Sequence, residues 1–148
     1  MTERLVVRTR SDRCRECQAC ALACSLYHDG ACGLSAARLA VTKDMARFTF
    51  DITICRHCPS PVCVDACPVD AISVDLHGVV RIDEDECVRC GACASGCPFG
   101  AIFYDALGDR YLTCDLCAGR DGGPLCVEIC PASALELVCV DDESQESV

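Results

Sequence analysis

The stretch CVRCGACASGCPFGAI, from Cys87 to Ile102, decides how this sequence is interpreted. It holds four cysteines, Cys87, Cys90, Cys93 and Cys97, and Pro98 follows the last of them directly. Proline lacks an amide hydrogen and fixes its φ angle, so it ends a helical turn and sets the direction of the chain. Four thiols at such short spacing, followed by a fixed turn, indicate a set of ligands for an inorganic centre.

The same arrangement recurs, and this internal repeat organises the chain. Sixteen of the 18 cysteines fall into four groups: Cys14, Cys17, Cys20 and Cys24; Cys55, Cys58, Cys63 and Cys67; Cys87, Cys90, Cys93 and Cys97; Cys114, Cys117, Cys126 and Cys130. Groups two to four end in Cys-Pro, whereas Ser25 follows the last cysteine of group one. We interpret the two remaining cysteines, Cys32 and Cys139, as buried or incidental thiols.

The composition predicts a thin apolar core. The 148 residues include no Trp, four Phe and three Tyr. A chain of this length with so few aromatic side chains is marginally stable by burial alone. We therefore expect a centre bound to the cysteines to contribute part of the stability.

Charge and the absence of targeting signals restrict the location and the partners. No apolar run in the sequence is long enough for a signal peptide or a membrane span. We therefore predict a cytoplasmic protein, although a partner's signal could carry such a chain to the periplasm. Structural disulfides are disfavoured in a reducing cytosol. The net charge of −10 argues against a nucleic-acid surface and suits a basic patch on a protein partner.

The pattern between the cysteines predicts an α+β fold with small two-stranded sheets. The tails CPVDAISV, CPFGAIFY and CPASALEL each end in a short apolar strand. We expect one or two helical turns before each final cysteine, and a hairpin with Gly78 at its turn and Val79–Ile82 as a strand. ARLAVTKD and RFTFDITI alternate apolar and polar residues and predict an added β-element after group one. We expect residues 141–148 to form a flexible acidic tail.

The spacing of group three indicates iron–sulfur chemistry. C-x₂-C-x₂-C-x₃-C-P is the run of bacterial ferredoxins, in which the fourth cysteine binds the other cluster of a pair. Cys87, Cys90 and Cys93 are thus predicted to hold one cluster, while Cys97 reaches a second. Zinc is the alternative, because groups two and four contain C-x₂-C pairs. Zinc motifs, however, come as two pairs, whereas here three close cysteines and a fourth followed by proline recur.

Other polar residues give no catalytic constellation. We interpret His28, His57 and His77 as surface residues or as residues behind the ligands, and Asp83–Glu86 as a solvated acidic run. No nucleophile lies in a pattern with a general base. We therefore expect no catalytic centre in this chain.

At these cysteine groups the sequence resembles the four-cluster, ferredoxin-like electron-transfer subunits of molybdopterin and tungstopterin oxidoreductases. The resemblance spans roughly residues 4 to 138 and includes the widened fourth group. The length and the segment CSLYHDGACGLSAARLAV are most similar to the small iron–sulfur subunits of tungsten aldehyde oxidoreductase-type enzymes. The resemblance implies four 4Fe-4S clusters, a large tungsten- or molybdenum-pterin catalytic partner, and a second redox partner such as a flavin- or NAD-linked subunit.

The resemblance also implies how the groups pair. Groups one and four would share two clusters, and groups two and three would share the other two. The implied ligand sets are Cys14, Cys17, Cys20 and Cys130; Cys114, Cys117, Cys126 and Cys24; Cys55, Cys58, Cys63 and Cys97; Cys87, Cys90, Cys93 and Cys67. An inner dicluster module, residues 55–108, would then be inserted into an outer one, residues 1–54 and 109–148.

Three hypotheses for function follow. The first is a tightly bound electron-transfer subunit of a larger oxidoreductase. The second is a free polyferredoxin, or a ferredoxin linked to a hydrogenase or carbon monoxide dehydrogenase. The third is a structural or regulatory module that binds zinc or a labile cluster.

Overall fold

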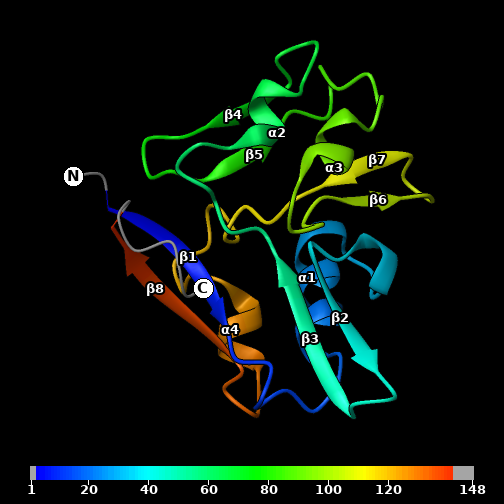
Figure 1. Cartoon of the computed structure of the whole chain (residues 1–148), viewed down its shortest axis with the longest axis vertical. Helices are drawn as coiled ribbons and strands as arrows, with labels where there is room; N and C mark the ends of the chain where they lie inside the picture. Colours follow the sequence, from blue (N-terminus) through cyan, green and yellow to red (C-terminus); the bar gives the residue numbers. More distant parts are fainter. Residues whose placement is uncertain (1–2, 142–148) are drawn as a thin grey trace.

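The computed structural model describes residues 3–141. Between these residues the strands form four two-stranded antiparallel sheets, linked by short helices and cysteine-rich loops (Figure 1). In chain order the elements are β1 (Arg4–Thr9), α1 (Ala19–Asp29), the 3-10 helix η1 (Leu34–Ala36), β2 (Leu39–Asp44), β3 (Thr49–Ile54), α2 (Val62–Asp65), β4 (Ile72–Val74), β5 (Val80–Ile82), α3 (Ala92–Gly96), β6 (Phe103–Asp105), β7 (Arg110–Leu112), α4 (Leu125–Ile129) and β8 (Leu135–Val140). The α+β prediction is confirmed.

The two ends of the described chain lie side by side. Strand β1 pairs with β8 along its whole length, from Arg4 opposite Val140 to Thr9 opposite Leu135. Helices α1 and α4 also pack together. We call these elements, with the β2–β3 hairpin, the outer region; they occupy the lower part of the view in Figure 1. Its core contains Val6, Val7, Ala21, Leu39, Ile52, Ile54 and Leu135.

The middle of the chain forms what we call the inner region, residues 55–112. It contains the β4–β5 and β6–β7 hairpins and the packed helices α2 and α3. Gly78 lies in the turn of the first hairpin with φ 78°, as predicted. The β6–β7 hairpin crosses the predicted module boundary at residue 108, because β7 pairs with β6 and not with an outer strand.

The predicted β-element after group one is present as the β2–β3 hairpin. It lies against the first cysteine loop, where Gln18 Nε2 donates to the carbonyl of Val41 at 3.4 Å. Lys43 Nζ lies 3.3 Å from Glu16 Oε1 of the same loop. The predicted acidic tail, 141–148, falls outside the described residues except for Asp141. No helix between residues 3 and 141 has the length and apolar character needed to cross a membrane.

Candidate iron–sulfur site

The four cysteine loops share one backbone geometry. The residue before the second cysteine of each group has a left-handed conformation: Glu16, His57, Arg89 and Leu116, with φ between 46° and 58°. Residues other than glycine rarely adopt this backbone conformation. In groups one and three left-handed residues recur at every second position, at Glu16 and Gln18 and at Arg89 and Gly91, whereas in group four Cys117 is left-handed as well as Leu116. Alternation of left- and right-handed residues turns successive amide groups to one side, and a concave arrangement of this kind binds anions. The sequence analysis did not predict it, because none of the four residues is glycine.

A second shared geometry follows the fourth cysteine. The third residue after it is again left-handed in groups two to four, at Asp70, Gly100 and Ser133. The next residue is a buried alanine in all three groups: Ala71, Ala101 and Ala134. The Cys-Pro turn thus places a small side chain against the core at the start of each strand.

Backbone amides donate hydrogen bonds to six cysteine sulfurs. The donor residue and the accepting Sγ are Arg38 and Cys24 (3.3 Å), His57 and Cys55 (3.4 Å), Ala71 and Cys67 (3.2 Å), Leu116 and Cys114 (3.4 Å), Leu125 and Cys117 (3.5 Å), and Ala134 and Cys130 (3.3 Å). Hydrogen bonds of this kind favour the thiolate over the thiol.

The structure brings cysteines from different groups together. The thiol of Cys20 interacts electrostatically with Cys130 as well as with Cys14 and Cys17 of its own group. Cys126 likewise interacts with Cys117 and with Cys24. Cys20 and Cys24 lie in α1, Cys126 lies in α4, and Cys130 follows α4 directly. The packing of α1 against α4 therefore brings group one to group four.

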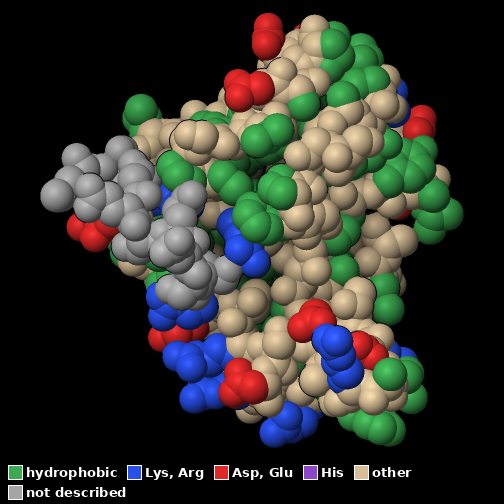
Figure 2. Space-filling model, in the orientation of Figure 1, with side chains coloured by type: hydrophobic (Ala, Val, Ile, Leu, Met, Phe, Trp, Pro, Cys, Tyr) green, Lys and Arg blue, Asp and Glu red, His purple; other side chains and the backbone are tan. Residues whose placement is uncertain are grey.

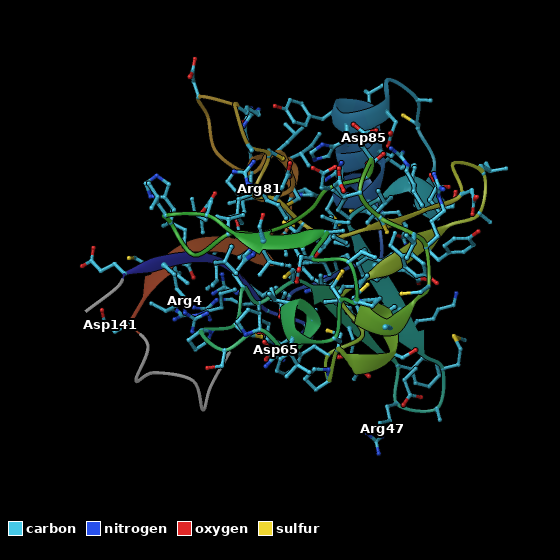
Figure 3. The ribbon with its side chains drawn as sticks, turned by 90° about the horizontal axis from the view of Figure 1, so that it is seen from above. Arg4, Arg47, Asp65, Arg81, Asp85 and Asp141 are labelled. Atoms are coloured by element: carbon cyan, nitrogen blue, oxygen red, sulfur yellow. The ribbon has the colours of Figure 1, made fainter. Side chains whose placement is uncertain are left out.

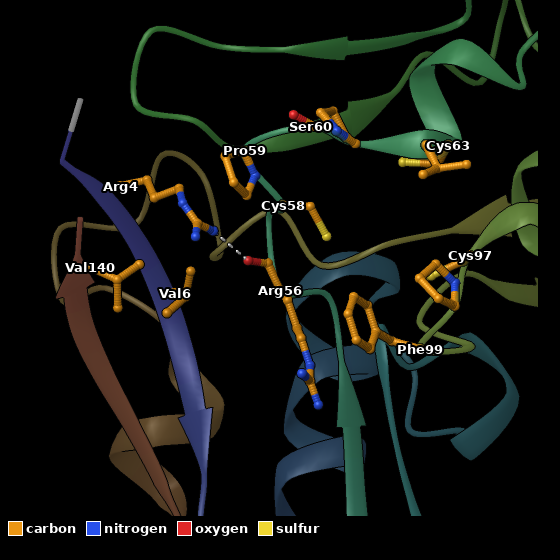
Figure 4. Close-up of a pocket in the computed structure, with 13 residues that line it drawn as sticks. Arg4, Val6, Arg56, Cys58, Pro59, Ser60, Cys63, Cys97, Phe99 and Val140 are labelled. Atoms are coloured by element: carbon orange, nitrogen blue, oxygen red, sulfur yellow. Dashed lines mark hydrogen bonds between the residues drawn. The ribbon is translucent and has the colours of Figure 1, made fainter. Parts of the chain in front are cut away.

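Groups two and three meet in the inner region. Cys63 interacts with Cys55 and Cys58 of its own group and with Cys97 of group three. Figure 4 shows Cys58, Cys63 and Cys97 around one cavity of about 270 Å³, which Arg4 and Phe99 also line. Cys67 of group two lines a second cavity with three cysteines of group three, Cys87, Cys90 and Cys93.

Burial raises the pKa of many of these thiols. Desolvation is the largest cause, and the neighbouring cysteines add to it: the pKa of Cys126 rises to about 12 and those of Cys20, Cys24 and Cys63 to about 11. Three or four thiolates in such a place need a strongly cationic centre to neutralise them. Between residues 3 and 141, no three His, Cys, Asp or Glu side chains converge closely enough to hold one metal ion. The chemistry of the donors themselves, thiolates in groups of four, fits the corners of an iron–sulfur cluster.

The histidines take different positions. His57 is fully buried, its Nδ1 accepts from the amide of Val80 at 3.1 Å, and burial lowers its pKa to about 4. Nε2 of His28 lies 3.4 Å from a carboxylate oxygen of Asp115, which stands between two cysteines of group four. His77 is exposed. His28 and His57 thus lie behind the cysteine loops and His77 lies on the surface, as the sequence analysis expected of such residues.

Cys32 and Cys139 are both exposed. Of the two predicted alternatives, buried thiols are therefore excluded, because Cys32 lies in the loop after α1 and Cys139 is exposed on the paired strand β8. Their interpretation as incidental thiols stays a prediction. Neither thiol is among the neighbours of the four groups described above.

Comparison with known proteins identifies the class. The family model of the 4Fe-4S dicluster domain matches residues 45–140, and that of a 4Fe-4S binding domain matches residues 11–27. The chain therefore belongs to the 4Fe-4S dicluster domain family. Together with the 18 cysteines, this membership establishes multiple 4Fe-4S clusters as its cofactors.

Two relatives show the setting in which similar chains occur. The chain is 38% identical to the polyferredoxin-like subunit of an aliphatic sulfonate oxidoreductase from Pyrococcus furiosus, over 86% of this chain and 72% of the relative. It is 29% identical to the electron transfer subunit PhsB of a thiosulfate reductase from Salmonella typhi, over 96% and 79%. Both names agree with an iron–sulfur electron-transfer subunit of an oxidoreductase.

The fold also occurs in a solved enzyme complex. A chain of the active site complex BamBC of benzoyl coenzyme A reductase, bound to 1,5-dienoyl-CoA, matches with a TM-score of 0.60 at 23% identity. The match covers 100% of this chain and 83% of that chain. At this identity the likeness shows the fold alone.

Proposed function

We propose that the chain is an electron-transfer subunit with four 4Fe-4S clusters, which relays single electrons between a tungsten- or molybdenum-pterin catalytic subunit and a second redox partner. One observation supports the proposal: in each case the last cysteine of one group lies near cysteines of its partner group, namely Cys130 near Cys20, Cys24 near Cys126, Cys97 near Cys63 and Cys67 near Cys90. That is the ligand pattern of paired clusters in bacterial ferredoxins.

The proposed ligand sets follow these neighbours. They are Cys14, Cys17, Cys20 and Cys130 for cluster 1; Cys114, Cys117, Cys126 and Cys24 for cluster 2; Cys55, Cys58, Cys63 and Cys97 for cluster 3; and Cys87, Cys90, Cys93 and Cys67 for cluster 4. The backbone amides described above would hold the thiolates in place and stabilise their charge.

The proposed architecture is one dicluster module inserted into another. The β1–β8 pairing and the contact of α1 with α4 support an outer module made from both ends of the chain. The contact of α2 with α3 supports an inner module. Because β7 pairs with β6, we place the end of the inner module after Leu112 and not at residue 108.

Interactions between individual thiols support a continuous order of the four proposed sets. Cys20 of the first set interacts with Cys126 of the second. Cys114 of the second interacts with Cys55 of the third. The third and fourth sets are joined by group two, which contributes Cys63 to one and Cys67 to the other. When bound, a 4Fe-4S cluster accepts or releases one electron, and the protein's part is to hold neighbouring sites close and largely dry.

The relatives support an oxidoreductase as the setting, since both are named as subunits of such enzymes. Within that class we propose a small subunit of the tungsten aldehyde oxidoreductase type as the most specific assignment. A free polyferredoxin would carry the same clusters without a bound catalytic subunit, so composition of the purified complex separates the two.

The test is anaerobic purification from the native host, with iron, acid-labile sulfide, tungsten, molybdenum and co-eluting subunits quantified together. We expect about 16 iron atoms per chain and a large pterin-containing partner that holds tungsten. Molybdenum in that partner would reject the tungsten assignment alone. Full iron without any partner would favour a free polyferredoxin, and zinc in place of iron would reject the electron-transfer function.

A further inference from the structure

One face of the inner region combines exposed apolar side chains with an exposed thiol. Val88 is 58% exposed and Val69 is 38% exposed. Both valines line the same cavity as Cys67 and Cys90, and Cys90 itself is exposed. Apolar surface therefore lies directly over the fourth set of thiols.

Two tyrosines extend this surface onto the β6–β7 hairpin. The hydroxyl of Tyr111 would lie only 2.6 Å from a Cβ atom at Gly91, so the ring covers the cysteine loop closely. The ring of Tyr104 packs against that of Tyr111, with 5.0 Å between centroids, and Tyr104 is 49% exposed. We call the surface formed by Val69, Val88, Cys90, Tyr104 and Tyr111 the contact face.

Negative charges border the contact face. Asp70 follows Val69 directly, and Asp85 and Glu86 immediately precede Cys87. All three acids are exposed, and none has an ion-pair partner within the part of the chain that the structure describes. Arg89, the cation of the same loop, forms an ion pair with Asp109, with 3.7 Å between Nε and Oδ2. The border is therefore negative.

The other end of the molecule has the opposite character. Residues 1–50 hold eight Lys and Arg against five Asp and Glu, whereas residues 51–148 hold five against 18. Figure 2 shows Lys and Arg side chains gathered at the lower end of the molecule, and in Figure 3 Arg47 and Asp85 lie at opposite edges. A positively charged partner would therefore be drawn to the inner region more strongly than to residues 1–50.

We propose that the contact face docks a one-electron redox protein whose own surface is apolar at the centre and ringed by Lys and Arg. The inference rests on the proposed function and adds where such a partner binds. An apolar centre excludes water over the fourth thiol set, and tyrosine is enriched at the centres of protein interfaces. The acidic border matches a basic ring and sets the orientation in which the two proteins meet.

The test uses the chemically reduced full-length holoprotein and, as a probe, a lysine-rich c-type cytochrome in its ferric form. Each electron transferred oxidises the chain by one equivalent and reduces one ferric haem to ferrous. The rate constant is measured by stopped flow across a range of salt concentrations. Asp70→Asn/Asp85→Asn/Glu86→Gln is compared with Asp51→Asn/Asp121→Asn/Asp141→Asn, which removes the same charge from exposed acids away from the face.

We expect the border variant to slow the reaction about tenfold at low salt and to flatten its salt dependence, while the control variant changes the rate less than twofold. Val88→Ser should slow the reaction without changing the salt dependence. If both triple variants slow the reaction equally, the net charge of the chain sets the rate and the contact face does not. If Val88→Ser leaves the rate unchanged, the apolar centre is rejected. Either result overturns the proposal.

Iron content and the number of electrons taken up are determined first for every variant. A wild-type chain that contains no iron or takes up no electrons would reject the proposed function itself. Full uptake together with indistinguishable cytochrome kinetics would reject the contact face alone.

Discussion

The outer and inner regions hold similar sets of cysteines but differ greatly in their amount of regular secondary structure. In the outer region β1 and β8 pair over six residues, β2 and β3 pair over six, and α1 has 11 residues. In the inner region each strand has three residues and the helices have four and five. Isolated hairpins of that size are marginal in water. The inner region therefore depends far more on what its cysteines bind.

Removal of iron should separate the two regions most strongly. In the apoprotein we expect the amides of residues 55–112 to lose their protection from hydrogen exchange, while β1, β2, β3 and β8 keep part of theirs. The measurement is hydrogen exchange by mass spectrometry before and after anaerobic chelation. Simultaneous loss of protection in both regions would show that the longer strands do not make the outer region independent.

Matched core truncations should sharpen the same contrast. Leu135 in β8 and Ile72 in β4 are 3% and 4% exposed. Replacing either residue by Ala should lower the free energy of unfolding of the holoprotein by about 2–5 kcal/mol. Anaerobic guanidinium denaturation measures this change. In the apoprotein only Leu135→Ala should still reduce protection from exchange. An effect of Ile72→Ala on the apoprotein would show that β4 stays packed without iron.

Arg110 joins the two regions, and its loss should uncouple them. Its guanidinium contacts Asp29 at the end of α1, Glu84 at 3.3 Å and the buried Asp105 at 3.2 Å. Backbone amides and Arg110 outweigh the desolvation that raises the pKa of Asp105, so this pKa lies below its usual value and the carboxylate is charged at neutral pH. Arg110→Gln should destabilise the holoprotein by about 3 kcal/mol, measured by anaerobic thermal unfolding.

Arg81 provides the control for that variant. Its side chain is 44% exposed and pairs with Asp75 inside a single hairpin. Arg81→Gln should therefore cost less than about 1 kcal/mol. Equal losses for the two variants would mean that Arg110 does not link the regions.

The smallest expected effect concerns the turn where the inner region touches β1. Gly78 has φ 78°, and an added Cβ would lie 2.9 Å from the Cβ of Arg4. Gly78→Ala should lower the free energy of unfolding by about 2 kcal/mol. Gly100 has φ 61° and an added Cβ would meet no atom within 4 Å, so Gly100→Ala should lower it by about 1 kcal/mol. Anaerobic thermal unfolding compares the two variants. Equal losses of stability would show that the side chain of Arg4 moves away from the added methyl group without an energetic penalty.

Local elements were predictable from the sequence because proline, glycine and alternation act over a few residues. The Cys-Pro tails do lead into β4, β6 and β8, and Gly78 does form the turn. Cys20 illustrates the opposite case: nothing near it in sequence indicates that Cys130 is its neighbour, and only the resemblance implied it. The left-handed Glu16, His57, Arg89 and Leu116 were also missed, since the loop imposes a conformation that these residues do not favour.

The length of α1 exceeded the prediction for similar reasons. One or two turns were expected before each final cysteine, yet α1 continues past Cys24 to Asp29. Group one lacks the proline that stops the helix elsewhere, and Gly30, with φ 70°, ends it instead. The absence of proline at Ser25 was visible in the sequence, so this longer helix could have been predicted.

The pairing of β1 with β8 has a consequence for biosynthesis. Because β1 pairs with β8, from Arg4 opposite Val140 to Thr9 opposite Leu135, β1 cannot form its sheet until residues 135–140 have left the ribosome. Long-range pairing of this kind forms late. The inner region draws only on residues from the middle of the chain, so it can close while translation continues. Under the proposed ligand sets, the N-terminal cysteines must wait for α4 and are the thiols most in need of protection by the assembly machinery.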